Sequence, residues 1–254
     1  MSELSFNLDD KVAVVTGGSR GIGLEITKMM LAQNARVVIC GRKQEGLDAA
    51  KEQVGAGDDR FLALRAHIAK EDDVDNLFEK TKDAFGKVDI LINNVGMNIV
   101  TSVVDAEYSL WNKIIESNLS GTFLCSRKAG RIMREQKSGK IVSISSIAAR
   151  RAAPAMGVYG IAKAGIEMMT KVLAQELAPF NIQVNAVAPC MVKTDFSKVF
   201  WSNRELHDQI VKTIPLGRIP ESSDIAYPTL FLCSQGADFM TGQTILVDGG
   251  ACAI

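Results

Sequence analysis

Short runs of hydrophobic residues recur along the chain and predict strands. The first run, VAVVT, lacks the alternation of polar and apolar positions that a half-exposed strand shows. Continuous runs of this length are typical of strands buried on both faces of a parallel sheet. The predicted strands are Val12–Thr16, Arg36–Cys40, Arg60–Leu64, Val88–Asn93, Lys140–Ser145, Ile182–Val187 and Thr244–Val247.

Longer segments with helical spacing of apolar residues separate these runs. Examples are Ile22–Gln33, Glu71–Phe85, Ser120–Arg134 and Tyr159–Leu177. Strands that alternate with such helices predict right-handed βαβ units. No linker rich in Pro, Gly or Ser interrupts the series. We therefore predict a single domain over residues 1–254, an α/β Rossmann-type fold with a doubly wound parallel sheet of about seven strands.

Composition narrows the class of protein. The chain is 47% hydrophobic, and its 29 basic side chains balance 29 acidic ones, which argues against a general nucleic-acid binder. No apolar run approaches the roughly 20 residues of a membrane span, and the start MSELSFNLDD lacks a secretory pattern. The five cysteines are scattered without metal-ligand spacing. We expect a cytoplasmic enzyme or binding module with no metal, nucleic-acid or membrane partner.

The first predicted strand ends in TGGSRGIG, a glycine turn before a helix. Backbone N–H groups and the positive helix end at such a turn bind the pyrophosphate of a dinucleotide. The spacing of Gly17, Gly21 and Gly23 departs from the common G-x-G-x-x-G form, and a glycine turn can also be a tight connection. Its place in the first βα unit favours a nucleotide.

The end of the second predicted strand indicates which dinucleotide binds. An acidic residue there would bind the ribose 2′-hydroxyl of NAD, but Arg42 and Lys43 follow Cys40 and Gly41 instead. Arg42, with Arg20 in the glycine turn, suits a 2′-phosphate. The residues favour NADP(H), and NAD(H) stays possible because Arg42 and Lys43 can also be solvated residues at a helix start.

Tyr159 and Lys163 lie four residues apart on a predicted helix, with Ser146 upstream. Residues at this spacing share a helix face. A cation about 4 Å away, at an effective dielectric near 20, supplies roughly the 4 kcal/mol that lowers a tyrosine pKa from ~10 to ~7. Such a phenol can exchange the proton that alcohol–carbonyl interconversion requires, while Ser146 holds the substrate oxygen.

Together these residues resemble the short-chain dehydrogenase/reductase family over nearly the whole chain. Further segments similar to that family are Asn93-Asn94-Val95-Gly96, Ser117-Asn118-Leu119, Asn185-Ala186-Val187-Ala188-Pro189 with Thr194, and Val247-Asp248-Gly249-Gly250. The overall pattern is most similar to 3-oxoacyl-carrier-protein reductases and related carbonyl reductases. Arg131, Arg134, Lys137 and Lys140 are candidates for carrier recognition or an ordinary exposed helix end, and Phe180 stands where such reductases often have a basic residue.

The resemblance implies roles for these residues. Tyr159 would be the general acid in reduction and, as phenolate, the general base in oxidation. Lys163 would lower the Tyr159 pKa and bind the nicotinamide ribose. Ser146 would orient the carbonyl, and Asn118 would hold a water in a proton relay. Implied cofactor contacts are Gly17, Ser19, Arg20, Gly21, Ile22, Gly23, Arg42, Asn94, Gly96, Tyr159, Lys163, Pro189, Val192 and Thr194.

Three positions depart from the family pattern. Val95 replaces alanine, which alters packing only. Cys190 replaces the glycine after Pro189, and we expect a buried, inert thiol there. His67 with Ile68 stands where the family commonly has Asp-Val, which puts the adenine contact of that aspartate in question.

The substrate is expected over the nicotinamide, beneath a lid at approximately residues 190–215 and beside residues 150–156. Candidate substrate contacts are Asn98, Met156, Phe196 and Trp201, although the aromatic residues can instead pack against a neighbouring subunit. Family members pair the helices corresponding to Ser120–Arg134 and Tyr159–Leu177 across a two-fold axis. A homotetramer or homodimer is therefore expected, with residues 251–254 at a second interface.

The predicted function is NADP(H)-dependent interconversion of a ketone and a secondary alcohol. An NAD-dependent dehydrogenase acting on a cyclic, steroid-like or sugar-like alcohol would share every motif. A non-catalytic cofactor-binding scaffold is the third possibility, disfavoured because the catalytic residues are all present.

Overall fold

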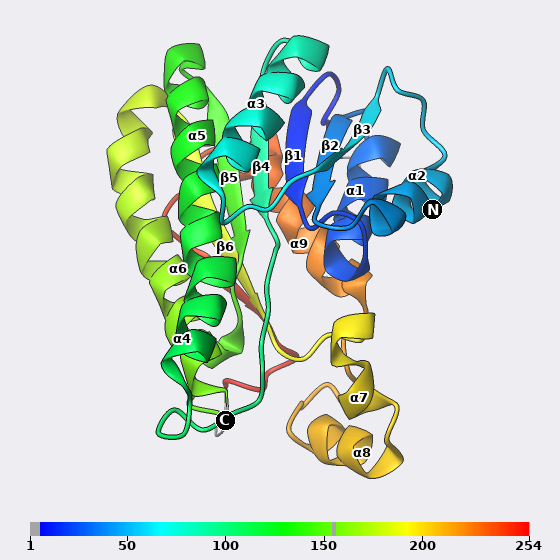
Figure 1. Ribbon diagram of the computed structural model, residues 1–254, viewed down its shortest axis with the longest axis vertical. Coiled ribbons are helices and arrows are strands. Elements are labelled where there is room, and N and C mark those ends of the chain that lie inside the picture. Colours follow the sequence, from blue (N-terminus) through cyan, green and yellow to red (C-terminus); the bar gives the residue numbers. More distant parts are fainter. Residues whose placement is uncertain (1–5, 154–155, 254) are drawn as a thin grey trace.

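The computed structural model describes residues 6–153 and 156–253, and seven strands in these ranges form one parallel sheet (Figure 1). The strand order is β3-β2-β1-β4-β5-β6-β7. The strands are β1 Val12–Thr16, β2 Arg36–Gly41, β3 Phe61–Arg65, β4 Ile90–Asn93, β5 Gly139–Ile144, β6 Ile182–Pro189 and β7 Thr244–Val247. The predicted fold class is confirmed, and each predicted strand matches an observed strand with small shifts at the ends.

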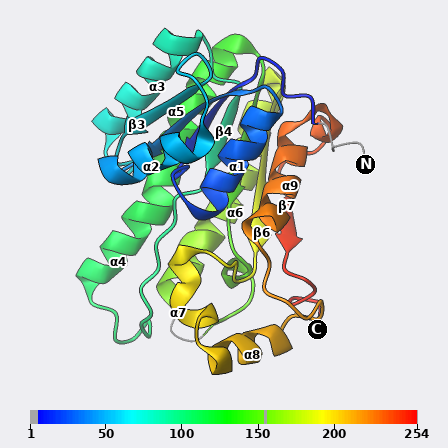
Figure 2. The ribbon, with the colours of Figure 1, turned by 90° about the vertical axis from the view of Figure 1, so that its right-hand side faces the viewer.

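Helices cover both faces of the sheet (Figures 1 and 2). The helices are α1 Gly21–Ala32, α2 Gln44–Val54, α3 Glu71–Phe85, α4 Tyr108–Ile115, α5 Gly121–Gln136, α6 Gly157–Leu177, α7 Lys198–Trp201, α8 Arg204–Lys212 and α9 Ser222–Cys233. A π-helical turn, Glu116–Ser120, joins α4 to α5. Among the described helices, none is long and apolar enough to cross a membrane.

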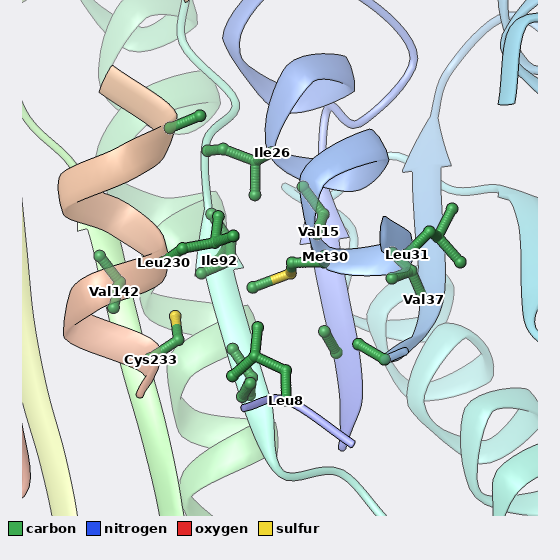
Figure 3. Close-up of a cluster of buried hydrophobic side chains, with 14 of the residues drawn as sticks. Leu8, Val15, Ile26, Met30, Leu31, Val37, Ile92, Val142, Leu230 and Cys233 are labelled. Atoms are coloured by element: carbon green, nitrogen blue, oxygen red, sulfur yellow. The ribbon is translucent and has the colours of Figure 1, made fainter. Parts of the chain in front are cut away.

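Successive side chains of a strand point to opposite faces of the sheet and pack in two different hydrophobic cores. In β1, Ala13 and Val15 pack with α1, α2 and α9, whereas Val12 and Val14 pack with α3, α5 and α6 on the other face. Figure 3 shows the first of these cores, with side chains of α1 and α9 closing over the sheet. Because both directions are apolar, β1 needs no polar alternation.

The strand order reverses at β1, which pairs with β2 on one side and β4 on the other. In open parallel sheets, ligands bind at such a point, outside the carboxyl ends of the strands. The carboxyl ends of β1, β4, β5 and β6 lead into the glycine turn, Asn94, Ser146 and Pro189. The fold therefore brings the predicted functional segments to one edge of the sheet.

Candidate active site

Thr16 fastens the glycine turn after β1 to the end of β4. Its hydroxyl accepts hydrogen bonds from the backbone N–H groups of Asn94 (3.0 Å) and Val95 (3.3 Å) and donates to the Ile92 carbonyl (3.3 Å). The Asn94 side-chain amide donates to the carbonyls of Thr16 and Gly17, both at 3.1 Å. The side-chain amide nitrogen of Asn94, a residue predicted to contact the cofactor, therefore holds the glycine turn in place.

Close packing requires glycine within this turn. A Cβ atom at Gly23 would lie 2.4 Å from the Gly17 carbonyl oxygen, and one at Gly18 would lie 2.4 Å from the Ile39 side chain. Behind the turn, no side chain caps the first N–H groups of α1, and its first turn contains no acidic residue. The open positive end of a helix binds anions, so these residues fit the pyrophosphate of a dinucleotide.

Arg20 and Arg42 lie exposed beside the turn, and neither forms an ion pair with another described residue. Ser19 connects the two segments, because a Cβ at Gly41 would lie 3.6 Å from the Ser19 hydroxyl oxygen. Exposed arginine side chains on these two neighbouring segments suit a phosphate group. The arrangement is compatible with the predicted 2′-phosphate site.

Tyr159 and Lys163 share one face of α6, with the Lys163 nitrogen 5.5 Å from the centre of the Tyr159 ring. The Lys163 ammonium group is buried and donates to the Ile144 carbonyl at 2.8 Å. Burial lowers the pKa of Lys163 to about 8. Burial raises the pKa of Tyr159 to about 12, and a hydrogen bond with Ser146 acts in the opposite direction. Burial thus outweighs the lowering expected from the neighbouring lysine.

Asn118 lies in the π-helical turn between α4 and α5 and is fully buried. Its amide donates to the carbonyls of Met97 and Ile114, each at 2.8 Å, and its oxygen accepts from the Met97 N–H at 3.2 Å. A Cβ at Gly96 would lie 3.4 Å from both the Asn118 oxygen and the Lys163 nitrogen. Asn118 therefore holds the segment after β4 close to Lys163, where the predicted relay would run.

The segment after β6 returns to the glycine turn. A Cβ at Gly21 would lie 3.3 Å from the Thr194 methyl group, so these two predicted cofactor contacts are adjacent. Val192 instead packs into the core on the α1 and α9 side. The Trp201 indole N–H donates to the Thr194 carbonyl at 2.9 Å, which folds α7 back onto this segment.

The predicted substrate contacts have different environments. The side-chain oxygen of Asn98 is buried with no hydrogen-bond partner among the described residues. Met156 forms an isolated β-bridge with Thr101, which joins the loop after β4 to the start of α6. In the segment predicted to form a lid, Phe196 is exposed, and α7 and α8 extend away from the sheet and its covering helices (Figures 1 and 2). Pro154 and Ala155, in the predicted border segment 150–156, and Ile254 lie outside the described residues.

The unusual residues at positions 67 and 190 have local roles. The His67 ring Nδ1 accepts from the Ala69 N–H at 3.3 Å, and the His67 N–H donates to Asp73 at 2.7 Å. Burial raises the pKa of Cys190 to about 11, which keeps the thiol protonated and unreactive. The described residues contain no group of three or more His, Cys, Asp or Glu that could hold a metal ion.

One buried carboxylate near the site has no predicted role. Glu167 follows Lys163 by one turn of α6, accepts a hydrogen bond from Ser145 and pairs with Arg150. The available signal in the sequence is the i, i+4 spacing from Lys163, which puts an acidic residue on the inward face of the helix.

The chain matches the family model described as enoyl-(acyl carrier protein) reductase over residues 17–252. It is 36% identical to an NAD-dependent glycerol dehydrogenase of Listeria innocua, covering 96% of this chain and 95% of the relative. It is also 36% identical to a 3-oxoacyl-[acyl-carrier-protein] reductase of Synechocystis (96% and 97% covered). A 3alpha-hydroxysteroid dehydrogenase of Mediterraneibacter gnavus is 37% identical (96% and 98% covered).

A solved structure from Sinorhizobium meliloti, described as a short-chain alcohol dehydrogenase, has the same fold. It matches with a TM-score of 0.92 and 34% identity, over 98% of this chain and 99% of that one. Similarity of this extent in sequence and in structure shows that the chain belongs to the short-chain dehydrogenase/reductase family of NAD(P)-dependent oxidoreductases.

Proposed function

We propose that this enzyme interconverts a ketone and a secondary alcohol with NADP(H), and that Tyr159 exchanges the proton. The observation that supports this most strongly is the meeting of Ser146, Tyr159 and Lys163 beside the glycine turn at one edge of the sheet. These groups can bind a carbonyl oxygen and deliver a proton to it.

Different residues of the chain carry out different parts of the proposed reaction. A bound nicotinamide supplies or accepts the hydride. In reduction, the Ser146 hydroxyl donates a hydrogen bond to the substrate oxygen, and the Tyr159 O–H bond breaks as the alcohol O–H bond forms. The Lys163 ammonium group stabilises the phenolate that remains. Asn118 holds the backbone on the far side of Lys163, where a water can return the proton.

The exposed guanidinium groups of Arg20 and Arg42, which form no ion pair within residues 6–153 and 156–253, support the preference for NADP(H). Wild-type and Arg42→Ala enzymes are titrated with NADPH and NADH by cofactor fluorescence. Arg42→Ala should weaken NADPH binding about tenfold or more, which is about 1.4 kcal/mol, and leave NADH binding unchanged. Arg131→Ala, which removes an exposed arginine of α5, is the control. Equal weakening of both cofactors would contradict the assignment.

The alternative is an NAD-dependent dehydrogenase for a sugar-like or steroid-like alcohol, which the names of the glycerol and hydroxysteroid dehydrogenases favour. Tighter binding of NADH than NADPH by the wild type, with oxidation of such alcohols, would select it. Carrier recognition is less well supported, because Lys140 pairs with Asp238 and the Arg134 guanidinium lies over the Phe180 ring.

Tyr159→Phe separates an enzyme from a scaffold. We expect the variant to lose turnover on a panel of ketones and to keep the NADPH affinity of the wild type, because only the proton donor is removed. Unchanged turnover would exclude Tyr159 as the proton donor. A wild type that binds cofactor and converts no ketone or alcohol would favour the scaffold.

Exposed hydrophobic side chains on α5 and α6 support a homodimer or homotetramer built on these helices. They are Phe123, Ile161, Met168 and Val172. Sedimentation showing a monomer at all concentrations would exclude it. All five cysteines are free thiols, which supports a cytoplasmic location.

A further inference from the structure

A buried carboxylate of α6 bonds to both ends of the turn that carries Ser146. Glu167 is 8% exposed. One of its oxygens accepts from the Ser145 hydroxyl at 3.2 Å, and the other accepts from Arg150 Nε at 2.9 Å. Ser145 directly precedes Ser146, and Arg150 directly follows the 3₁₀ turn Ile147–Ala149. The Glu167 side chain therefore bonds to residues on both sides of Ser146 in the sequence.

The same helix face carries the proton donor. Tyr159, Lys163 and Glu167 are spaced four residues apart along α6, so the phenol, the ammonium group and the carboxylate succeed one another on one side. The turn lies directly against this helix, since a Cβ at Gly160 would be 2.7 Å from the Ala148 carbonyl oxygen. Glu167 thus joins the element that holds Tyr159 to the element that holds Ser146.

This ion pair contributes little to stability by itself, because the Glu167 carboxylate loses its hydration while the Arg150 side chain stays 39% exposed to water. Its directional bonds nevertheless fix the geometry of the groups that it joins. An apolar residue at position 167 would pack without losing hydration, and it would leave the Ser146 turn without this anchor. The arrangement is suited to positioning more than to stabilising the fold.

We propose that Glu167, with Ser145 and Arg150 as its partners, is a positioning residue that keeps the Ser146 hydroxyl aligned with the Tyr159 phenol. The proposal rests on the proposed function, which gives Ser146 and Tyr159 their roles. Glu167 touches no reacting atom and acts through the turn.

The first test compares turnover in variants of the pair. Glu167→Gln keeps the shape and loses the charge, and Arg150→Gln removes the other partner. Because small misplacements of reacting groups reduce rates strongly, we expect kcat to fall about 10- to 100-fold in both, with KM and NADPH affinity within about twofold of wild type. Arg150→Lys, which keeps the positive charge, should recover part of the rate. An unchanged kcat in fully folded Glu167→Gln enzyme would overturn the proposal.

The control is an ion pair at the other end of β5. Lys140 bonds Asp238 at 2.6 Å in a pair whose lysine is largely buried and whose carboxylate is exposed, so Asp238→Asn removes one partner of a half-buried pair far from Ser146. We expect Asp238→Asn to change thermal stability without changing kcat. If kcat falls equally in Asp238→Asn and Glu167→Gln, lost stability explains the effect and the positioning proposal is wrong.

A double-mutant cycle tests whether Glu167 acts through the serine. In a Ser146→Ala background the hydroxyl is gone, so adding Glu167→Gln should lower kcat by less than about twofold. If the two losses instead multiply, Glu167 affects the reaction by another route and the proposal is wrong.

Hydrogen exchange supplies a readout that needs no substrate. The Ala148 N–H donates to the Ser146 hydroxyl, and the N–H groups of Ala149 and Arg150 donate within the same turn. In Glu167→Gln, these amides should exchange about tenfold faster than in wild type. In Asp238→Asn, they should exchange at the wild-type rate. Equal exchange in Glu167→Gln and wild type would overturn the proposal. If the wild type converts no ketone or alcohol, the proposed function fails, and exchange alone decides whether Glu167 anchors the turn.

Discussion

Replacing Lys163 by methionine should make the cofactor-free chain more stable at neutral pH. Burial lowers the pKa of Lys163 from 10.5 to about 8, so the folded chain binds this proton more weakly than the unfolded chain does. The difference between the two pKa values corresponds to roughly 3 kcal/mol of destabilisation. Lys163→Met also removes the hydrogen bond to the Ile144 carbonyl, worth about 1 kcal/mol, which leaves a net gain of about 2 kcal/mol.

The pH dependence separates this electrostatic gain from a gain in packing. Below about pH 8 the lysine is charged in both states, and the folded chain bears the full penalty. Between about pH 8 and pH 10.5 the folded chain has released the proton and the unfolded chain still holds it, so wild-type stability rises with pH. At pH 9.5 the penalty falls to about 1 kcal/mol, which is close to the value of the lost hydrogen bond, and Lys163→Met should have almost no advantage.

Urea unfolding at pH 7 and pH 9.5 measures this difference. The control is Lys171→Met, which replaces an exposed lysine of the same helix and should not change the free energy of unfolding with the same pH pattern. If Lys163→Met gains the same free energy at both pH values, burial of the charge is not the cause. No gain at pH 7 would refute the reasoning altogether. The more stable variant should also lose turnover, since it lacks the ammonium group.

Two further predictions concern the glycine turn. Thr16→Val leaves two partly buried backbone N–H groups without this partner and should lower the thermal midpoint by about 4 to 8 °C, corresponding to about 2 kcal/mol, whereas Thr16→Ser should retain most of the stability. An unchanged midpoint in calorimetry would contradict this. Gly23→Ala places a Cβ 2.4 Å from the Gly17 carbonyl oxygen and should weaken NADPH binding at least about tenfold in a fluorescence titration. Gly130→Ala, whose Cβ would make ordinary contact, should bind as wild type does.

Buried strands and long amphipathic helices were predictable because their pattern is local. VAVVT is apolar throughout because both of its faces are covered, and the fold confirms this. Some helices were not predicted, among them α9, which is well buried, and two helices that bury little. Only Leu47 and Ala50 of α2 are buried, and only Ile114 of α4, which is too little apolar pattern to distinguish a helix from a loop. The π-helical turn depends on bonds that Asn118 makes to residues after β4, which local sequence does not show.

The candidate site was predictable where two residues share one helix face. The spacing of Tyr159 and Lys163 places both on the same side of α6, as the structure shows. Other features depend on tertiary contacts. Asn94 holds the glycine turn through β1, and Glu167 meets Arg150 only when β5 and α6 pack together. The balance between burial and neighbouring charge at Tyr159 likewise requires the folded environment.

The protonation state of Tyr159 bears on the direction of the proposed reaction. Burial raises the pKa of Tyr159 to about 12, so the protonated phenol, which can donate a proton, predominates at neutral pH. Reduction of a ketone needs that form, whereas oxidation of an alcohol needs the phenolate. The hydrogen bond from Ser146 acts to lower the pKa, and any positive charge brought close to the phenol would act in the same direction. The proposed reduction uses the form of Tyr159 that burial favours, whereas oxidation of an alcohol would need a positive charge close to the phenol to favour the phenolate.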